Sequence, residues 1–147
     1  MTVKRILQRK GATVVTSRPD KPIAALAQLF KSQHIGAVVV VGEDGAILGM
    51  ASERDIVNHF AERGETGLAR GVVADIMSIS VVTCGPNDRL DKVMEQMTRY
   101  CVRHLPVVED GRLVGIVSIG DAIMHRLEEN KLEIDVLRDA ARARPVG

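Results

Sequence analysis

The chain has 147 residues, of which 46% are hydrophobic but only 2% are aromatic, so its core must be built from aliphatic side chains. Twenty basic residues against nineteen acidic ones give a net charge of +1, which leaves no electrostatic footprint for nucleic acid or for a membrane surface. With one Tyr, two Phe and no Trp, an aromatic platform for stacking single-stranded bases is also excluded. A chain of this length fits one compact domain or two small, closely packed ones.

The N-terminal residues lack the apolar stretch of a signal peptide, and no segment is long and apolar enough to span a bilayer. We therefore expect a cytoplasmic protein. Its two cysteines, Cys84 and Cys101, have neither metal-binding nor redox spacing. Both are predicted to be buried or semi-buried thiols in a reducing compartment.

An internal duplication organises the chain. Residues 14–16 recur as residues 81–83, and residues 35–41 align with residues 102–108 at the same offset of 67. The turn that follows is one residue shorter in the second copy, so the offset becomes 66 for the rest of the repeat. A single indel in a turn is typical of a tandem duplication, because turns tolerate length changes.

Each repeat predicts the order strand, helix, strand, hairpin turn, strand, helix. In the first repeat these elements are a lead-in at 2–7, a strand at 14–16, a helix around 23–30, strands at 37–41 and 46–50, and a helix after Asp55. In the second they are a lead-in at 72–77, a strand at 81–83, a helix around 90–97, strands at 105–108 and 112–117, and a helix after Asp121. The polar, glycine-containing stretch 61–71 is predicted to be a surface linker. Residues 127–144 are predicted to form a charged helical tail that stops near Pro145.

Both repeats place a Ser-x-x-Asp sequence where the last strand meets the last helix, as Ser52 to Asp55 and as Ser118 to Asp121. One interpretation is a capping box, in which the serine and the acidic residue satisfy the first backbone N–H groups of the helix. The other is a ligand site, because helix N-termini attract phosphate and a carboxylate can bind two ribose hydroxyls. Two copies in matching contexts favour the ligand site.

These features resemble the tandem cystathionine-β-synthase (CBS) domain pair. The resemblance lies in Gly49-x-x-Ser-x-x-Asp55, in Gly115-x-x-Ser-x-x-Asp121, in the Arg-His-Leu-Pro-Val-Val strand at 103–108 and in the two Asp-Gly turns. It implies two pseudo-symmetric β-α-β-β-α units, in the α/β (α+β) class, packed as an intramolecular pair. The chain then divides into a first unit with its lead-in at 1–62, a linker and second lead-in at 63–77, a second unit at 78–128 and a helical tail at 129–147.

The resemblance further implies a non-catalytic regulatory protein that binds an adenine nucleotide (AMP, ATP or NAD(H)) in clefts between the units. It also implies a homodimer formed through helices, and a regulated protein partner that the sequence does not identify. The positions that match the family's ligand-binding pattern are Thr16, Ala37, Val38, Ser52, Arg54, Asp55, Thr83, Arg103, His104, Leu105, Pro106, Ser118 and Asp121. In that pattern the two aspartates hold ribose, and main-chain groups of the central strands meet the adenine.

The two clefts are not expected to be equal. Arg103 and His104 occupy the positions of Gly36 and Ala37 in the first repeat, whereas Arg54 has only a glycine as its counterpart. Phosphate requires positive charge, preferably a guanidinium. Two alternatives stay open: a surface ion pair for the arginine at 103 and an interior role for the histidine at 104.

Two other functions are possible: a structural dimer or docking protein with vestigial clefts, and a small enzyme. No nucleophile–base pairing can be argued from the sequence, and it has no phosphate-binding loop for NTP hydrolysis. His34, His59 and His125 lack ligand spacing, so we expect surface histidines and no metal site.

Overall fold

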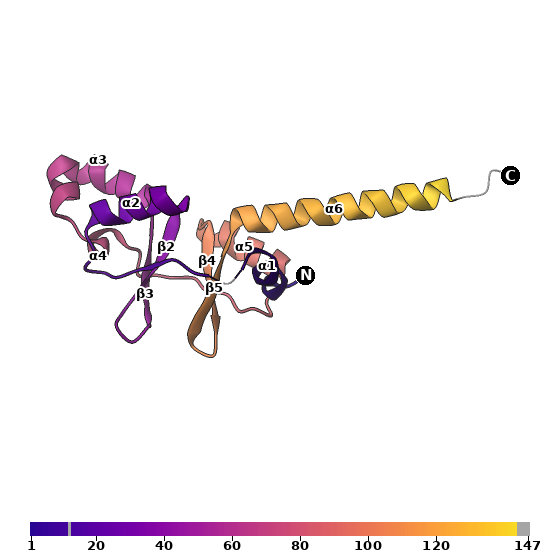
Figure 1. Ribbon diagram of the computed structural model, residues 1–147, viewed down its shortest axis with the longest axis horizontal. Coiled ribbons are helices and arrows are strands. Elements are labelled where there is room, and N and C mark those ends of the chain that lie inside the picture. The colour runs from indigo at the N-terminus through magenta and orange to yellow at the C-terminus, as the bar shows by residue number, and fades with distance from the viewer. Residues whose placement is uncertain (12, 144–147) are drawn as a thin grey trace.

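The computed structural model describes residues 1–11 and 13–143. Its elements are α1 (Val3–Lys10), β1 (Thr16–Ser17), α2 (Ile23–Gln33), β2 (Ala37–Val41), β3 (Ile47–Ser52), α3 (Glu53–Arg70), α4 (Val73–Ile76), α5 (Leu90–Tyr100), β4 (His104–Glu109), β5 (Arg112–Ser118) and α6 (Ile119–Arg142). The predicted pair of mixed helix-and-strand units is confirmed. Figure 1 shows the β2–β3 and β4–β5 hairpins side by side, with α2 and α3 on one and α1, α5 and α6 on the other.

The two hairpins have the same internal design. In the first, Ala37 pairs with Ser52, and in the second His104 pairs with Ser118, so each Ser-x-x-Asp sequence lies opposite the start of its neighbouring strand. Both ladders also carry a register shift at the matching place, between Val40 and Val41 and between Val107 and Val108. The duplication read from the sequence therefore extends to the irregularities of the sheets.

The first strands of the two units differ. In the first unit β1 is a two-residue strand that pairs in parallel with β2, through Thr16 and Val39. In the second unit the strand predicted at 81–83 does not form, and an isolated bridge between Cys84 and Val107 takes its place. A strand this short contributes few hydrogen bonds, so a single bridge can replace it without loss of the core behind it.

Each lead-in packs against the unit of the other repeat. Val3, Ile6 and Leu7 of α1 belong to the core of the second unit, whereas Val73 of α4 belongs to the core of the first. The hydrogen bonds correspond as well. Val3 N donates to the carbonyl of Asp88 at 3.0 Å, and Val73 N donates to the carbonyl of the corresponding Lys21 at 2.8 Å.

The glycine of each Gly-x-x-Ser-x-x-Asp sequence allows this close approach. A Cβ atom on Gly115 would lie 2.7 Å from a methyl group of Leu7, and one on Gly49 would lie 2.6 Å from the carbonyl oxygen of Ser78. Ser78 and Met50 also exchange two backbone hydrogen bonds of 2.8 and 2.9 Å. Each glycine therefore lets the exchanged segment lie directly on the last strand of the hairpin.

The connection between the units is more helical than predicted. The surface linker expected at 61–71 is instead largely the second half of α3, which continues to Arg70 and contains one non-helical residue, Gly64 at φ 67° and ψ −165°. Seven of residues 61–70 are exposed and the other three are half-buried, so the stretch lies on the surface as a linker would. The helix persists because Gly64 absorbs the kink at a conformation that other residues rarely adopt.

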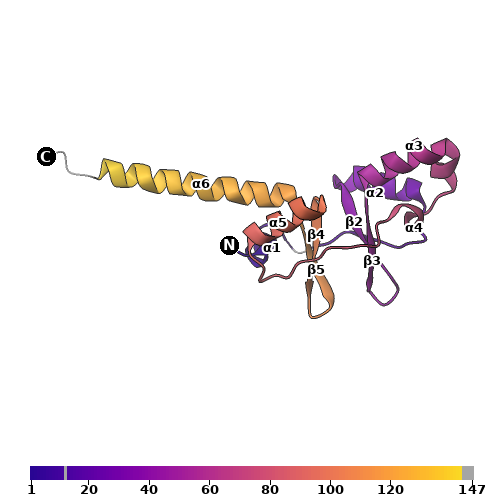
Figure 2. The ribbon, with the colours of Figure 1, turned by 180° about the vertical axis from the view of Figure 1, so that it is seen from behind.

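Helix α6 continues directly into the predicted tail and ends at Arg142, while the stop predicted at Pro145 lies outside the described residues. Its first three turns contact the body of the protein, through the buried Ala122 and His125 and through the ion pair of Glu128 with Arg9. Figures 1 and 2 show the remainder extending away from both units. Across residues 1–11 and 13–143, no helix combines the length and the apolar character needed to cross a membrane.

Candidate functional site

Both Ser-x-x-Asp sequences form complete capping boxes. At the start of α3, the carboxylate of Asp55 accepts a hydrogen bond from Ser52 N at 2.9 Å, and Asp55 N donates to Ser52 Oγ at 3.3 Å. At the start of α6, the equivalent distances for Ser118 and Asp121 are 2.9 and 3.1 Å. The capping interpretation is therefore correct for both. It does not exclude the ligand interpretation, because each cap leaves the second carboxylate oxygen without a hydrogen bond from the described residues.

Around the first capping box lies a cavity of about 660 Å³, here named the Asp55 cleft. Its lining comes from the β3–α3 junction, from the start of β2, from the lead-in of the second repeat and from the α5–β4 loop of the second unit. The lining residues are Gly36, Ala37, Met50, Ala51, Ser52, Glu53, Arg54, Asp55, Val57, Ser78, Cys101, Val102, Arg103 and His104. The cleft thus lies between the two units, and six of the predicted site residues meet in it: Ala37, Ser52, Arg54, Asp55, Arg103 and His104.

The other predicted residues lie elsewhere. Val38 and Leu105 are fully buried in the two cores, and Pro106 is buried beside them. Thr16, the first residue of β1, and Thr83, which precedes the bridged Cys84, are exposed and lie outside the lining of the Asp55 cleft. Ser118 and Asp121 belong to the second capping box, where β5 ends and α6 begins.

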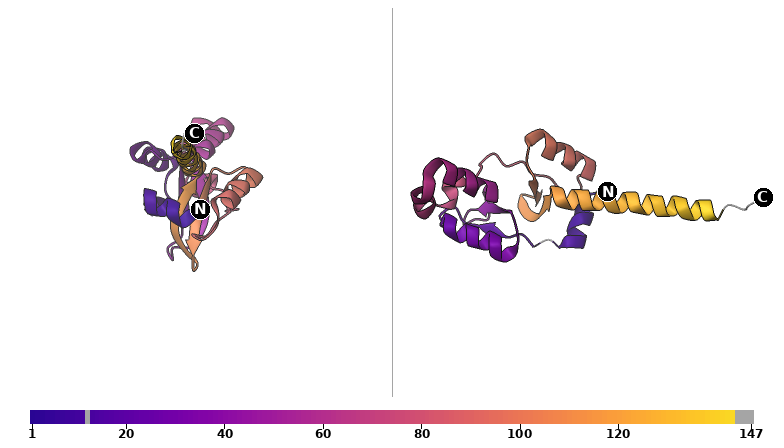
Figure 3. Two further views of the ribbon diagram at one scale, coloured as in Figure 1. Left: turned by 90° about the vertical axis from the view of Figure 1, so that its right-hand side faces the viewer. Right: turned by 90° about the horizontal axis from the view of Figure 1, so that it is seen from above.

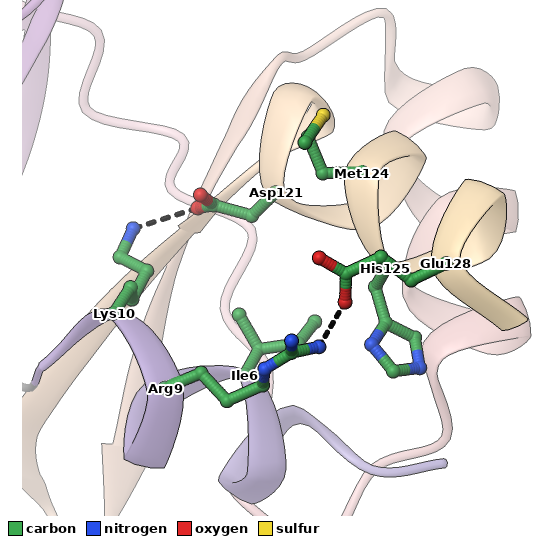
Figure 4. Close-up of a pocket in the computed structure, with 7 residues that line it drawn as sticks. All are labelled: Ile6, Arg9, Lys10, Asp121, Met124, His125 and Glu128. Atoms are coloured by element: carbon green, nitrogen blue, oxygen red, sulfur yellow. Dashed lines mark hydrogen bonds and ion pairs between the residues drawn. The ribbon is translucent and has the colours of Figure 1, made fainter.

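The second capping box is occupied by a cation from the N-terminal helix. Lys10, the last residue of α1, places its Nζ 2.6 Å from Oδ2 of Asp121, and both side chains are about two-thirds or more buried. The preceding residue, Arg9, forms an ion pair with Glu128 of α6. Figure 4 shows these two pairs closing the gap between α1 and α6. The cavity that remains, here named the Asp121 pocket, is about 190 Å³.

The ion pair changes the electrostatics of the second box. Burial alone would raise the pKa of Asp121, but the hydrogen bonds from Lys10 and from Ser118 outweigh it and hold the pKa below its usual range. The Asp121 carboxylate is therefore ionised and already neutralised by a lysine. For Asp55, by contrast, no lysine or arginine lies within ion-pair distance in the part of the chain that the structure describes.

Two guanidinium groups reach the Asp55 cleft. Arg54 and Arg103 are exposed, and neither forms an ion pair with a described residue, so the surface ion pair considered for Arg103 is not present. His104 is half-buried, and its pKa is held below the ordinary value first by burial and then by the positive charges of Lys10 and Arg103. Near neutral pH the imidazole is therefore uncharged, which makes it a hydrogen-bonding group rather than a cation.

Several lining residues of the Asp55 cleft, and the lysine at the Asp121 carboxylate, were not predicted from the sequence. Cys101, Val102 and Ser78 line the Asp55 cleft. Cys101 and Val102 directly precede Arg103, which could have indicated them, whereas Ser78 has no such neighbour. Lys10 could not have been found from the repeat pattern. Its role depends on α1 having eight residues where its counterpart α4 has four, and on the exchange of the lead-ins.

Three further predictions about cysteine and histidine can be compared with the structure. Cys84 is buried, as predicted, and burial together with the nearby Asp88 raises its pKa to about 12. The prediction of a buried or semi-buried thiol is wrong for Cys101, which is exposed at the end of α5, where it adopts a left-handed conformation (φ 53°). His125 is buried, with a relative exposure of 6%, because it lies on the face of α6 that packs against the body. No cluster of three potential metal ligands occurs among residues 1–11 and 13–143.

Comparison with known proteins identifies the module. The family model of the CBS domain matches residues 3–62 and 73–128. A CBS domain-containing protein of Bacillus subtilis, YhcV, is 34% identical over 114 residues, which is 78% of this chain and 79% of YhcV.

Two solved structures are informative. The CBS-domain protein ATU1752 of Agrobacterium tumefaciens is 44% identical, with a TM-score of 0.83 over 86% of this chain and 99% of that one. The CBS domain pair of the protein MJ0100, solved with 5′-methylthioadenosine and S-adenosyl-L-methionine, is 27% identical. Its TM-score is 0.76 over 89% of this chain and 98% of that chain.

Proposed function

The chain belongs to the CBS domain family as a tandem pair of CBS units, a regulatory module, and we propose that it senses an adenine nucleotide bound in the Asp55 cleft. The observation that carries this proposal is a carboxylate at a helix N-terminus beside two guanidinium groups that have no ion-pair partner among the described residues, Arg54 and Arg103. A carboxylate can accept hydrogen bonds from a ribose diol, and guanidinium groups bind phosphate.

The size and lining of the cleft support a ligand of this class. A volume of about 660 Å³ lies within the range of roughly 300–1,000 Å³ that is usual for small-molecule sites. Met50, Val57 and Val102 provide apolar surface against which a planar base can pack. The Asp121 pocket, at about 190 Å³, lies below the same range.

We assign a phosphate-bearing ligand, AMP, ATP or NAD(H), rather than an uncharged nucleoside. The ligands of MJ0100 contain adenosine but no phosphate, so a site for them needs no arginine at the phosphate position. 5′-Methylthioadenosine has no anionic group, and S-adenosyl-L-methionine has a single carboxylate beside two cationic groups, so neither offers Arg54 and Arg103 the negative charge that phosphate does. Their exposed, unpaired state costs nothing in water but gives strong charge-assisted hydrogen bonds when phosphate binds.

We further propose one nucleotide per chain and no chemical conversion of it. Lys10 occupies the Asp121 carboxylate, so a second nucleotide would have to displace a partly buried ion pair. In the Asp55 cleft, the Ser52 hydroxyl donates to the Asp55 carboxylate at 3.0 Å and accepts from Asp55 N at 3.3 Å, so both side chains are engaged in the helix cap. Exposed apolar side chains on α3, such as Val57 and Phe60, support the proposal that the body assembles as a homodimer.

The proposal is tested by calorimetry with AMP, ATP, NADH and adenosine. We expect about one nucleotide per chain, and we expect Arg103→Ala to weaken AMP about tenfold while changing adenosine by less than about twofold. Equal losses for AMP and adenosine would contradict the phosphate assignment. A second test is mass spectrometry of whatever the heat-denatured protein releases. If nothing is released and none of the four ligands binds, the module is a structural or docking protein with vestigial clefts.

A further inference from the structure

The second half of α6 lies outside the CBS module and makes no contact with it. The family match ends at residue 128, whereas the helix continues to Arg142. Every residue from 130 to 142 is exposed, and Figure 3 shows this part of the helix standing clear of both units. A helical segment of this length is marginal in water by itself, so its apolar side chains need a partner.

Along one side of α6, five apolar residues and one polar residue, Asn130, recur with alternating steps of four and three residues. The positions are Ile123, Leu127, Asn130, Ile134, Leu137 and Ala141. This is the a/d spacing of a heptad repeat, in which the a and d side chains of one helix pack into holes on another. All six side chains are exposed, and we name this set the seam of α6.

The seam points away from the body of the protein. The two buried residues of α6 are Ala122 and His125. At 3.6 residues per turn, the direction midway between them lies about 130° around the helix axis from the centre of the seam. The surface that carries the seam is therefore free along the whole helix, including the turns that contact the second unit.

We propose that α6 pairs with α6 of a second copy of this chain as a short parallel coiled coil. The polar seam residue supports this choice of partner. In a parallel pair Asn130 meets Asn130 of the second copy, and the two amides can hydrogen-bond to each other. In an antiparallel pair Asn130 lies opposite an apolar seam residue such as Ile134, which leaves its amide without a partner.

The charges beside the seam favour the same orientation. In a parallel pair, Glu133 of each chain faces Arg138 of the other, which gives two attractive pairs against two repulsive Arg126–Lys131 pairs. In an antiparallel pair that centres on the same stretch, Lys131 faces Lys131 and Glu133 faces Glu133, with no attractive pair to offset them. Like charges in contact destabilise such an interface.

A membrane surface fits this helix less well than a second copy does. Within Ile119–Arg142 there are six acidic residues and four Lys or Arg, a balance of 4 − 6 = −2. Helices that lie on anionic membranes carry Lys and Arg along their polar face. A negative balance repels an anionic surface, and α6 lacks the basic polar face that membrane binding requires.

The test compares two leucines of α6 that differ only in the side they face. Leu137 lies on the seam and is 69% exposed, whereas Leu132 lies on the opposite side and is 66% exposed. In a Cys101→Ser background, which removes the exposed native thiol, Leu137→Cys and Leu132→Cys are oxidised under mild conditions. We expect a disulfide-linked dimer with Leu137→Cys at a rate about tenfold above that of Leu132→Cys. Equal rates, a faster reaction with Leu132→Cys, or no cross-linking of either variant would overturn the proposal.

Substitutions at the same two leucines distinguish pairing through the seam from any other dimer contact. Leu137→Asp should weaken self-association about tenfold in sedimentation equilibrium. If the body also dimerises and hides this loss, the readout is a second cysteine on the seam, Ile134→Cys, whose cross-link Leu137→Asp should abolish. Leu132→Asp should do neither. The cross-link does not depend on nucleotide, so its failure would leave the proposed function untouched, and absence of nucleotide binding would leave the coiled coil untouched.

Discussion

Replacing the two capping aspartates one at a time separates the capping role from the ligand role. Asp55→Ala and Asp121→Ala each remove the carboxylate that accepts the backbone N–H of the capping serine, while the bond from residue 55 or 121 N to the serine Oγ remains, so each should lower the free energy of unfolding by about 1 kcal/mol. Asp121→Ala also breaks the ion pair with Lys10 and should cost more. For nucleotide affinity the order is reversed, because only Asp55 lines the larger cleft.

The expected loss of affinity follows from the hydrogen bonds that a ribose diol makes. Two hydrogen bonds to a carboxylate are worth roughly 1.5–3 kcal/mol each, and a replacing water returns part of that. We therefore expect Asp55→Ala to weaken AMP at least about tenfold, which is about 1.4 kcal/mol, and Asp121→Ala to change it by less than about twofold. Asp55→Asn is the matched control, because it keeps an acceptor for the cap but loses the charge that strengthens the ribose contacts.

The assay is calorimetry with AMP and adenosine, alongside denaturant unfolding of each variant. Adenosine should lose affinity in Asp55→Ala about as much as AMP does, because both ligands carry the same ribose. A carboxylate close to phosphate is repulsive, so tighter binding of AMP by Asp55→Ala would place phosphate, not ribose, at Asp55. Unchanged affinity for both ligands, together with the expected loss of stability, would leave Asp55 as a helix cap only.

Three more outcomes are expected. Lys10→Met should free the carboxylate of Asp121 and let its pKa rise, and the variant should lose less stability on acidification below about pH 4, because a lowered pKa gives stability that is lost as the pH falls through it. Folding lowers the pKa of His104, so the stability that its neutral form contributes is complete above about pH 6.5 and declines below that value. His104→Gln should therefore reduce the loss of unfolding free energy between about pH 7 and pH 5 in denaturant titrations. Gly49→Ala should destabilise the fold by about 1–3 kcal/mol in the same assay, because its Cβ would lie 2.6 Å from the backbone oxygen of Ser78, which cannot rotate away; a loss below about 0.5 kcal/mol would show that the segment yields easily.

The elements near the repeat signatures could be predicted because local chemistry determines them. The Ser-x-x-Asp sequences form the expected capping boxes, and the Asp-Gly turns lie between paired strands. The resemblance also named six residues that line one cleft in the structure. The caps and turns needed only short-range patterns and the repeat, whereas the cleft lies between the two units and depends on how they pack.

The exchange of the lead-ins could not be predicted in the same way. Residues 2–7 and 72–77 have matching apolar patterns, so either could fill either core, and the choice depends on the path of the whole chain. The linker prediction failed for a related reason. Glycine lowers helix propensity, but here Gly64 alone leaves the helical conformation and the helix resumes after it. Burial of His125 likewise depends on how α6 rests on the second unit.

The unequal lengths of the two lead-in helices explain why the duplication has two unequal clefts. Here α1 reaches the second unit with one more turn than α4, and that turn ends in Lys10 at the carboxylate of Asp121. His104 connects the two places, because it lines the Asp55 cleft while its pKa responds to both Lys10 and Asp121. Burial is the main cause of the lowered pKa of His104; the charge of Lys10 lowers it further and that of Asp121 opposes this, so the two clefts are electrostatically coupled.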